Sequence, residues 1–536
     1  MSASRERKLR QKPDTASAAE KSEKIKKEQK QAKTLKLQTT IFVVVCVLMV
    51  AVLIGYGIVC TGVVERNKTA LTVGEHKVTA AEMNYFFVTE AYEYYKQNAD
   101  LMKYFISSSA PLDQQVLNQD TGYTWADQFM EATVTKVRDT YAMYDKALAD
   151  GYELDEDTLS SIDTAIDSLS TYASLRGLSN ANAYLKSVYG RGCTTENYRH
   201  FLTVRQVAAG YAGQYNDNIT WTDQELADYE AKDPLKYNSY SFRNYFIAVN
   251  DYYDSDATDE EKAAAQVTAK DEADKMLAAS TTEDGFVASA NDIEVRTTKS
   301  TTSTDSTEET TAAYDASTAT LYTGVLRDNV NSTIAEWVTD SSRKAGDTTI
   351  VPSYSTADGQ EDTLIGYYVT MFLGSTDNSD VFTKDVRHIL VSDTSESGQE
   401  KAAELLAQFE EDPTEEHFAE MAKENSADSG SKDNGGLYEA VTPGQMVDAF
   451  NSWLFKEDHK AGDYGVIKTD YGYHLMYMVG DNISYRQSML ESDYRSSLYN
   501  DWYTEVTEGY TAERKGGMRW VNTSVYLNTS SSGSSN

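Results

Sequence analysis

One uninterrupted apolar segment near the N-terminus constrains this chain more than any other feature. No charged residue occurs from Thr39 to Val64, and Ile41–Cys60 is almost wholly apolar. Twenty such residues are long enough to cross the hydrocarbon core of a bilayer as one helix. We therefore predict a single transmembrane helix at 39–64 of the 536-residue chain.

The charges on the two sides of this segment predict its orientation. Residues 1–38 carry 12 basic and 5 acidic side chains, whereas residues 65–536 carry 37 basic and 79 acidic ones. Because basic flanks stay in the cytoplasm, we expect a cytoplasmic tail at 1–38, a single pass through the cell membrane and an extracytoplasmic remainder. A cleaved signal peptide and a lipid anchor on Cys60 are the alternatives. The basic leader is long for the first, and Val59 replaces the small residue that the second requires.

Composition excludes several other classes of protein. The net charge of −35 opposes nucleic-acid binding, because phosphate backbones select surfaces rich in Lys and Arg. Three cysteines, two of them in the apolar segment, form no disulfide framework. Six scattered histidines lack zinc-ligand spacing, and there is no G-x-S-x-G, H-E-x-x-H or P-loop motif. We expect neither a metal nor a cofactor.

Residues 65–235 are predicted to form a helical domain. A capping box at Thr79–Glu82 begins one helix, and stretches rich in Ala, Leu and Tyr fill residues 125–215 at helical spacing. The first helix is expected to bury a stripe formed by Met83, Phe86, Phe87, Ala91 and Tyr94. Breaks between the later helices are expected near Gly151, Gly177 and Gly190.

Beyond residue 236 the pattern alternates between strands and helices. Ser241–Val249 is predicted to be a strand, and a capping box at Thr258–Glu261 begins a helix over 257–280. Residues 297–319 are of low complexity, which predicts a mobile loop.

The C-terminal part is predicted to return to helix. Residues 485–512 carry an apolar stripe at helical spacing, and the segment 485–523 is expected to pack on the N-terminal helical domain. A disordered, Ser-rich tail is expected at 524–536.

The most specific motifs lie between residues 381 and 482. Val386–Val391 is predicted to be a buried strand with one histidine, followed by amphipathic helices at Gln399–Glu410 and Thr414–Glu424 and by a turn-rich segment at Ser426–Ser431. Gly435-Gly436 precedes a short strand, a further helix starts at Gly444–Val447, and His474–Val479 is the final strand.

These pieces, in this order, resemble the parvulin family of peptidyl-prolyl isomerases. The resemblance covers 381–482 and is carried by RHILV (387–391), FAEMAKENSADSGS (418–431), Gly435-Gly436, GQMV with Phe450, and KTDYGYH (468–474). It implies an α+β domain with prolyl isomerase activity. The family usually continues its Gly-Gly with Asp-Leu-Gly, whereas this chain has Leu437-Tyr438-Glu439, so the sequence preference of the site stays open.

The resemblance also implies roles for individual residues. A prolyl amide rotates over a barrier of about 20 kcal/mol, so an isomerase must hold the ring and favour the twisted amide. The implied polar site consists of the paired histidines His388 and His474 with Asp428 and Thr469. The implied proline-binding residues are Met446, Phe450, Phe455 and Gln445. Without the resemblance, these would be ordinary core and turn residues.

A second, degenerate copy is predicted upstream, at 236–376. Trp337 and Lys344-Ala-Gly-Asp347 repeat the spacing of Trp453 and Lys460-Ala-Gly-Asp463, and IGYYVTMFLG (365–374) parallels YGYHLMYMVG (471–480). The site residues differ: Tyr368 replaces His474, Ser353 replaces Thr469, Ile334 replaces Phe450, Val330 replaces Met446, and Asn244 or Tyr245 replaces His388. We expect this module to keep the fold without catalysing; chance similarity is the alternative.

The complete plan is α+β: one transmembrane helix, a helical body and two parvulin-like modules. It resembles the exported foldases related to PrsA and SurA. This resemblance implies a membrane-anchored, extracytoplasmic isomerase and chaperone that acts on newly exported polypeptides with Xaa-Pro bonds. A non-catalytic holdase that uses its parvulin folds as peptide grips is one alternative, and a scaffold for envelope machinery is another.

Overall fold

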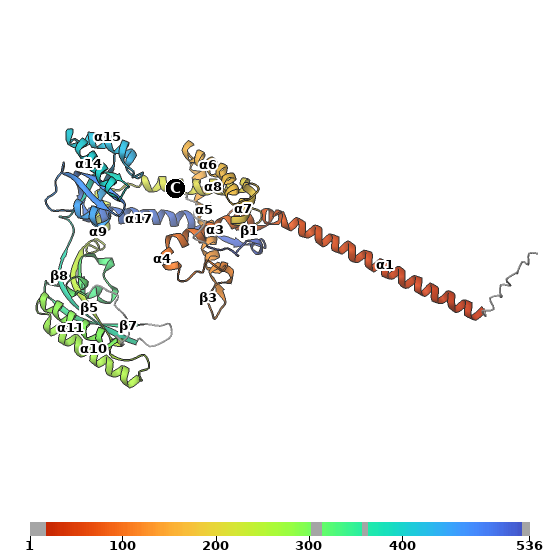
Figure 1. Ribbon diagram of the computed structural model, residues 1–536, viewed down its shortest axis with the longest axis horizontal. Helices are drawn as coiled ribbons and strands as arrows, with labels where there is room; N and C mark the ends of the chain where they lie inside the picture. The colour runs from red at the N-terminus through yellow and green to blue at the C-terminus, as the bar shows by residue number, and fades with distance from the viewer. Residues whose placement is uncertain (1–17, 302–313, 356–362, 528–536) are drawn as a thin grey trace, which may run out of the picture. The chain divides into compact units, whose positions relative to one another are not determined.

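The computed structural model describes residues 18–301, 314–355 and 363–527 (Figure 1). The chain divides into two compact units. Unit 1 joins the N-terminal part, up to Ile219, with the C-terminal part from Tyr499, and unit 2 is Thr220–Leu498. Helices and several separate sheets occur together, so the predicted mixed α+β class is confirmed.

The N-terminal helix α1 (Ala18–Cys60) contains the apolar segment. Within the described residues, the stretch Lys33–Leu53 is the one helical segment that is long and apolar enough to cross a membrane, judged by length and composition alone. Its apolar side chains are exposed among the described residues: Phe42 and Leu53 are each 67% exposed. A short helix, α2 (Val63–Asn67), follows.

Unit 1 contains a three-stranded antiparallel sheet built from both ends of the chain. Its strands are β1 (Thr69–Val73), β2 (His76–Thr79) and β13 (Ala512–Arg514), in the order β13-β1-β2. Leu71 pairs with Arg514 on one side and with Val78 on the other. The turn between β1 and β2 uses Gly74, whose φ of 53° is in the left-handed region that favours glycine.

Helices make up the rest of unit 1, and the glycine breaks fall between them as predicted. The helices are α3 (Ala80–Gln97), α4 (Ala99–Met102), α5 (Trp125–Ala149), α6 (Glu156–Leu175), α7 (Ala181–Tyr189) and α8 (Thr195–Asp217). A small hairpin of β3 (Val116–Asn118) and β4 (Tyr123–Thr124) precedes α5. Large side chains fill the core, among them Tyr85, Phe87, Leu185 and Phe201.

Two details of α3 differ from the prediction. Tyr94 is 42% exposed, and Tyr95 is buried instead, because it lies four residues after Ala91 on the same helical face. The capping box is only half made. Thr79 Oγ1 accepts from the Glu82 backbone N–H, but the Glu82 carboxyl turns inward and accepts from the Tyr141 hydroxyl.

The C-terminal segment contributes to the core of unit 1. The last helix is α17 (Tyr485–Glu508), and within unit 1 its Trp502 stacks on Tyr215 with ring centroids 3.8 Å apart. The prediction of a disordered tail from residue 524 onward was wrong for the first residues of this segment. Val525 and Leu527 are buried, and Val525 O accepts a hydrogen bond from Leu112 N. Residues 528–536 lie outside the described residues.

Unit 2 contains two four-stranded antiparallel sheets after the short helix α9 (Asp223–Glu230) (Figure 1). The upstream sheet has the order β6-β5-β8-β7. Its strands are β5 (Ser239–Ala248), β6 (Leu321–Leu326), β7 (Thr348–Ser355) and β8 (Thr363–Thr376). Its helices are α10 (Asp259–Ala279), α11 (Glu283–Thr301), α12 (Ala316–Ala319) and α13 (Ser332–Val338).

The downstream sheet repeats this arrangement in the order β10-β9-β12-β11. Its strands are β9 (Phe382–Val391), β10 (Leu437–Val441), β11 (Tyr464–Thr469) and β12 (Gly472–Ser484). Its helices are α14 (Glu396–Glu411), α15 (Glu415–Asn425) and α16 (Asp448–Leu454).

The two sheets also share their register. Phe242 on β5 pairs with Phe372 and Tyr322, as Val386 on β9 pairs with Met478 and Tyr438. The repeated Lys-Ala-Gly-Asp turn is built identically: the N–H of Gly346 donates to Phe372 O, and the N–H of Gly462 donates to Met478 O. These shared contacts argue against chance similarity between the two segments.

Two predicted boundaries in unit 2 were wrong. The low-complexity segment 297–319 is not one loop: its first residues end α11, Ala316–Ala319 form α12, and 302–313 lie outside the described residues. The helix expected to start at Gly444 begins at Asp448. Gly444 has a φ of 80°, which a right-handed helix does not accommodate, so Met446 lies in the preceding loop.

Candidate active site

Two neighbouring strands bring the paired histidines together. On the β9–β12 ladder, His388 faces Met476, and His474 faces Leu390. Residues two apart on a strand share a face, so the two histidines are diagonal neighbours on the same side of the sheet. Their rings lie nearly parallel with centroids 5.3 Å apart, and their Nδ1 atoms are 3.1 Å apart.

Asp428 reaches the histidines from the turn after α15. Backbone contacts anchor this turn to the end of β9: Ala427 N donates to Leu390 O, and Leu390 N donates to Ser426 Oγ. Asp428 Oδ2 then lies 2.9 Å from His388 Nε2. The Asp-containing turn and the histidine strand are therefore held as one piece.

The Gly-Gly pair lets another segment approach His388 closely. Gly435 and Gly436 have φ values of 67° and 75°, which other residues rarely adopt. Gly436 O accepts a hydrogen bond from His388 N, and a Cβ on Gly436 would lie 2.3 Å from His388 O. A side chain at this position would push the edge strand away from the site.

The hydrogen bonds of the site run in one direction. The Asp428 carboxylate can only accept, so His388 Nε2 carries the proton and donates to it. In neutral His388, Nδ1 is then an acceptor, so His474 Nδ1–H donates to it. His474 Nε2 accepts in turn from the Thr469 hydroxyl at 2.8 Å. The four polar residues expected from the sequence thus form one continuous relay.

Burial favours the neutral form of both histidines. Desolvation lowers the pKa of His388, and it outweighs the opposing effect of Asp428. Desolvation, together with the proximity of His388, lowers the pKa of His474 to about 4. Burial alone would raise the pKa of Asp428, but hydrogen bonds from Ser431, His388 and Tyr438 lower it to about 2. At neutral pH the site holds two uncharged imidazoles and one carboxylate.

Apolar side chains cover the other side of the histidines. Phe450 is buried and meets both rings edge-on, with centroid distances of 5.5 Å to His388 and 5.7 Å to His474. Met446 and Phe455 are partly buried and pack against the apolar cluster that contains Phe450. Gln445 differs from the other three candidate binding residues: it is exposed, and its side-chain oxygen accepts from the N–H of Thr442 at 2.9 Å.

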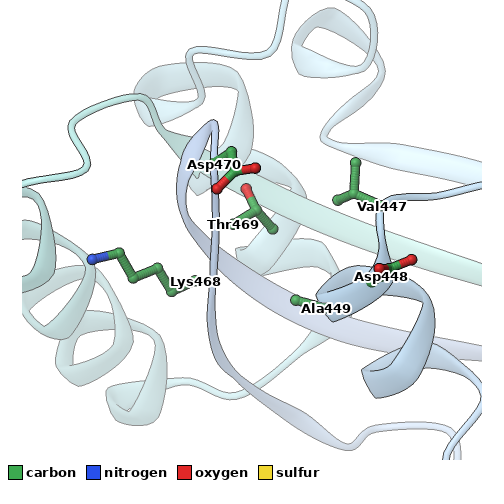
Figure 2. Close-up of a pocket in the computed structure, with 6 residues that line it drawn as sticks. All are labelled: Val447, Asp448, Ala449, Lys468, Thr469 and Asp470. Carbon is green, nitrogen blue, oxygen red and sulfur yellow. The ribbon is translucent and has the colours of Figure 1, made fainter. Parts of the chain in front are cut away.

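A cavity of about 580 Å³ opens beside the relay (Figure 2). It is lined by Val447, Asp448, Ala449, Lys468, Thr469 and Asp470. Thr469 belongs both to this lining and to the hydrogen bond with His474, so the cavity gives access to the end of the relay. Figure 2 shows the Lys468 side chain extending away from Val447 and Asp448.

Two members of the site were missed from the sequence. The hydroxyls of Ser431 and Tyr438 both donate to Asp428 Oδ2, Tyr438 at 2.9 Å. Ser431 ends the motif that contains Asp428, so its position was a usable signal. Tyr438 lies where the chain departs from the family pattern, and no local pattern indicates that its hydroxyl reaches the site.

The upstream sheet has other residues at the same positions. The register aligns Asn244 with His388, which decides between Asn244 and Tyr245. Thr370 Oγ1 donates to Asn244 Oδ1 at 2.8 Å. The Tyr368 hydroxyl, at the position of His474, accepts from the side-chain amide of Asn331 at 3.3 Å. Residues 302–313, in the Thr/Ser-rich segment between α11 and α12, lie outside the described residues.

Residues 367–481 match the PPIC-type PPIASE domain family. The match starts within β8, upstream of the expected boundary at 381, and ends in β12. The fold and the relay therefore belong to a parvulin-type peptidyl-prolyl cis-trans isomerase domain.

Among known proteins, the chain is similar to foldases named PrsA. It is 29% identical over 140 residues to foldase protein PrsA 1 of Listeria monocytogenes serotype 4b (strain F2365), covering 26% of this chain and 44% of that protein. It is 31% identical over 152 residues to foldase protein PrsA of Staphylococcus epidermidis (strain ATCC 12228 / FDA PCI 1200), covering 25% and 46%. The chain thus spans less than half the length of these relatives.

A solved structure of PrsA from Bacillus subtilis is also similar to this chain. The similarity covers 74% of this chain and 91% of that one, with 15% sequence identity and a TM-score of 0.27. The parvulin-type assignment rests on the matched domain and on the geometry of its site.

Proposed function

We propose that this protein is a membrane-anchored, extracytoplasmic peptidyl-prolyl cis-trans isomerase and chaperone for newly exported polypeptides. The observation that carries the proposal is the continuous relay from Thr469 through both histidines to Asp428, edge-on to Phe450. The catalytic segment is 381–482, with His388, Asp428, Thr469 and His474 as its polar residues. Met446, Phe450 and Phe455 form the socket for the proline ring.

The proposed mechanism needs no nucleophile. Rotation about a prolyl amide requires loss of amide resonance, over a barrier of about 20 kcal/mol. Phe450 and its neighbours hold the ring in an apolar socket, and the neutral imidazoles place no positive charge beside the twisted amide. A thousandfold acceleration needs only about 4 kcal/mol of preferential binding to the twisted form.

Gln445 has a weaker claim to substrate binding. Its side-chain oxygen accepts hydrogen bonds from the N–H and the hydroxyl of Thr442. In this proposal it supports the loop that holds Met446, and contact with a bound peptide is secondary.

Membrane attachment is proposed from α1 and from charge. The exposed apolar side chains of Lys33–Leu53 suit a lipid environment, and the basic residues 1–38 favour a cytoplasmic N-terminus. The relatives' name, foldase, supports polypeptide clients. Protease added to intact cells stripped of their wall should digest the part beyond residue 65 and spare the N-terminal tail. Protection of both parts would contradict this orientation.

The proposed division of the chain follows from these arguments. It comprises a cytoplasmic tail at 1–38, a membrane helix at 39–64, a helical chaperone domain at 65–235, a non-catalytic parvulin-like module at 236–376, the isomerase domain at 381–482, and a C-terminal segment at 485–523 that completes the chaperone domain.

A second candidate function is a holdase that grips peptides without isomerising them. The specific observation in its favour is the upstream sheet, which keeps the register of the isomerase domain while Asn244 and Tyr368 replace its histidines. A holdase predicts that client rescue is unchanged when the downstream site is disabled.

One experiment separates the two functions. Exchange of Xaa-Pro peptides is measured by NMR with the full chain in detergent, beside a Met446→Ala/Asp428→Ala double variant. The control is Val330→Ala/Ser353→Ala in the upstream module, at the positions that correspond to Met446 and Thr469. The proposal predicts that exchange is accelerated by the wild type and the control but not by the double variant. No acceleration by the wild type with varied flanking residues would contradict it and favour the holdase.

A further inference from the structure

Tyr438 contacts two members of the relay at once. It lies on the edge strand β10 opposite Val386, and its hydroxyl donates to Asp428 Oδ2 at 2.9 Å. Its ring also lies against the His388 ring, with centroids 5.4 Å apart and a tilt of 36°. One side chain therefore touches both the carboxylate and the imidazole that the carboxylate orients.

The backbone around Tyr438 is shaped to aim it at the site. The β9–β10 ladder has an irregularity between Tyr438 and Val441, and Ala440 within it has a φ of 49°. Ala440 N donates to Asp385 Oδ1 at 2.7 Å, which fixes the distorted segment to β9. Irregularities of this kind redirect the neighbouring side chains of a strand.

Space for the hydroxyl is also provided on the Asp428 turn. The Tyr438 hydroxyl oxygen lies 3.2 Å from where a Cβ on Gly430 would be. A side chain at residue 430 would crowd the hydroxyl, so the turn admits Tyr438 because glycine occupies this position.

We propose that Tyr438 is a positioning residue of the isomerase site and holds the Asp428 carboxylate in the orientation that engages His388. This inference rests on the proposed function. Three donors converge on Asp428 Oδ2, from His388, Ser431 and Tyr438, and together they hold the carboxylate ionised and in one orientation. An ionised Asp428 requires a proton on His388 Nε2, and this proton fixes the donor and acceptor roles along the relay as far as Thr469.

The segment Leu437-Tyr438-Glu439, which departs from the family pattern, thus contributes a residue to the site. Where the family usually has Asp-Leu-Gly, this chain supplies a hydroxyl to the acidic residue. Tyr438 acts through Asp428, and its role is distinct from gripping the proline ring.

The test compares the full chain with its Tyr438→Phe variant. Tyr438→Phe removes the hydroxyl and keeps the ring against His388. We expect kcat/KM to fall about tenfold, the effect of losing roughly 1.4 kcal/mol of stabilisation. The matched control is Tyr322→Phe, at the same register position of the upstream sheet, where the ring stacks on Phe242. This control should leave kcat/KM unchanged.

Two NMR measurements report positioning without relying on activity. The carboxyl carbon of Asp428 should titrate about one pH unit higher in Tyr438→Phe than in the wild type, because its ionised form loses a donor. At neutral pH Asp428 stays ionised in both proteins and His388 keeps its Nε2–H tautomer, but this proton should exchange with water faster in the variant, because the carboxylate that accepts it is held less firmly.

The outcomes separate this inference from the proposed function. An unchanged Asp428 titration and an unchanged exchange rate of the His388 Nε2 proton in Tyr438→Phe would overturn the positioning role, even if kcat/KM fell through lost packing. If the wild type showed no isomerase activity, the proposed function would fail, while the two NMR measurements would still decide whether Tyr438 holds the Asp428 carboxylate.

Discussion

Arg243 in the upstream sheet of unit 2 and Arg387 in the downstream sheet share contacts to one glutamate and two backbone carbonyls. Each donates from Nε to a glutamate in the first turn of a helix, Glu283 in one case and Glu415 in the other. Each Nη1 also donates to two neighbouring backbone carbonyls. These stabilising arginine contacts are thus present twice in the chain.

The next residue along each strand shows how the two sheets differ. Asn244 follows Arg243 and accepts from Thr370, whereas His388 follows Arg387 and joins a relay of four polar residues. The arginine contacts that stabilise this fold are thus independent of the groups proposed to catalyse. One sheet can therefore lose the site and keep the fold.

The largest expected effect comes from removing the arginine contacts that the two sheets share. Arg243→Ala and Arg387→Ala should each lower the free energy of unfolding of unit 2 by about 3 kcal/mol, because each arginine is largely buried and its removal leaves carbonyl oxygens without donors. Chemical denaturation of the full chain measures both losses. Lys401→Ala, which breaks an exposed ion pair, is the control and should cost less than 0.5 kcal/mol. A large loss in only one arginine variant would mean that the two sheets are not held in the same way.

The next effect is a pH dependence of stability that arises from His474 in the downstream sheet. His474 has a folded-state pKa of about 4, below its ordinary value of 6.5, so between these values the unfolded chain binds more protons than the folded one. The stability that neutral His474 contributes is complete above pH 6.5 and is lost as the pH falls towards 4, by up to roughly 3 kcal/mol.

Denaturation midpoints measured from pH 7 to pH 4 check this prediction. His474→Asn should flatten the pH dependence, because asparagine does not titrate in this range. Arg243→Ala, in the sheet without the paired histidines, should keep the slope of the wild type. An unaltered slope in His474→Asn would contradict the assignment of a buried, neutral imidazole.

The smallest effect concerns the end of the relay. Thr469→Val removes the hydroxyl that donates to His474 Nε2, and we expect kcat/KM to fall about fivefold, the effect of about 1 kcal/mol. Ser353→Ala, at the matching position of β7, should leave kcat/KM unchanged. Peptide-exchange rates measured side by side for the two variants test the comparison, and equal losses would erase the proposed difference between the sheets.

Much of the fold could be predicted from the sequence because its signals are local. Glycine breaks separated the helices of unit 1, and the repeated Lys-Ala-Gly-Asp turns indicated two related sheets. The structure brings His388, Asp428, Thr469 and His474 together, as expected from motifs with fixed spacing. In these cases the residues that carry the signal are also the residues that make the contact.

The parts that could not be predicted depend on distant partners. Leu527 lies next to a polar tail, yet it is buried because unit 1 offers it an apolar surface. Tyr438 reaches Asp428 only because glycines and a distorted strand edge aim it there. The start of α16 was misjudged because Gly444 adopts a positive φ that the sequence pattern does not reveal.

The central claim is that the downstream sheet catalyses and the upstream sheet does not. Its most direct test is NMR exchange of an Xaa-Pro peptide by the full chain, by Phe450→Ala and by Ile334→Ala, which change the same position of α16 and α13. If only the downstream sheet catalyses, Phe450→Ala should abolish the acceleration and Ile334→Ala, in preparations confirmed as folded, should retain it. Acceleration that survives in Phe450→Ala and disappears in Ile334→Ala would contradict it.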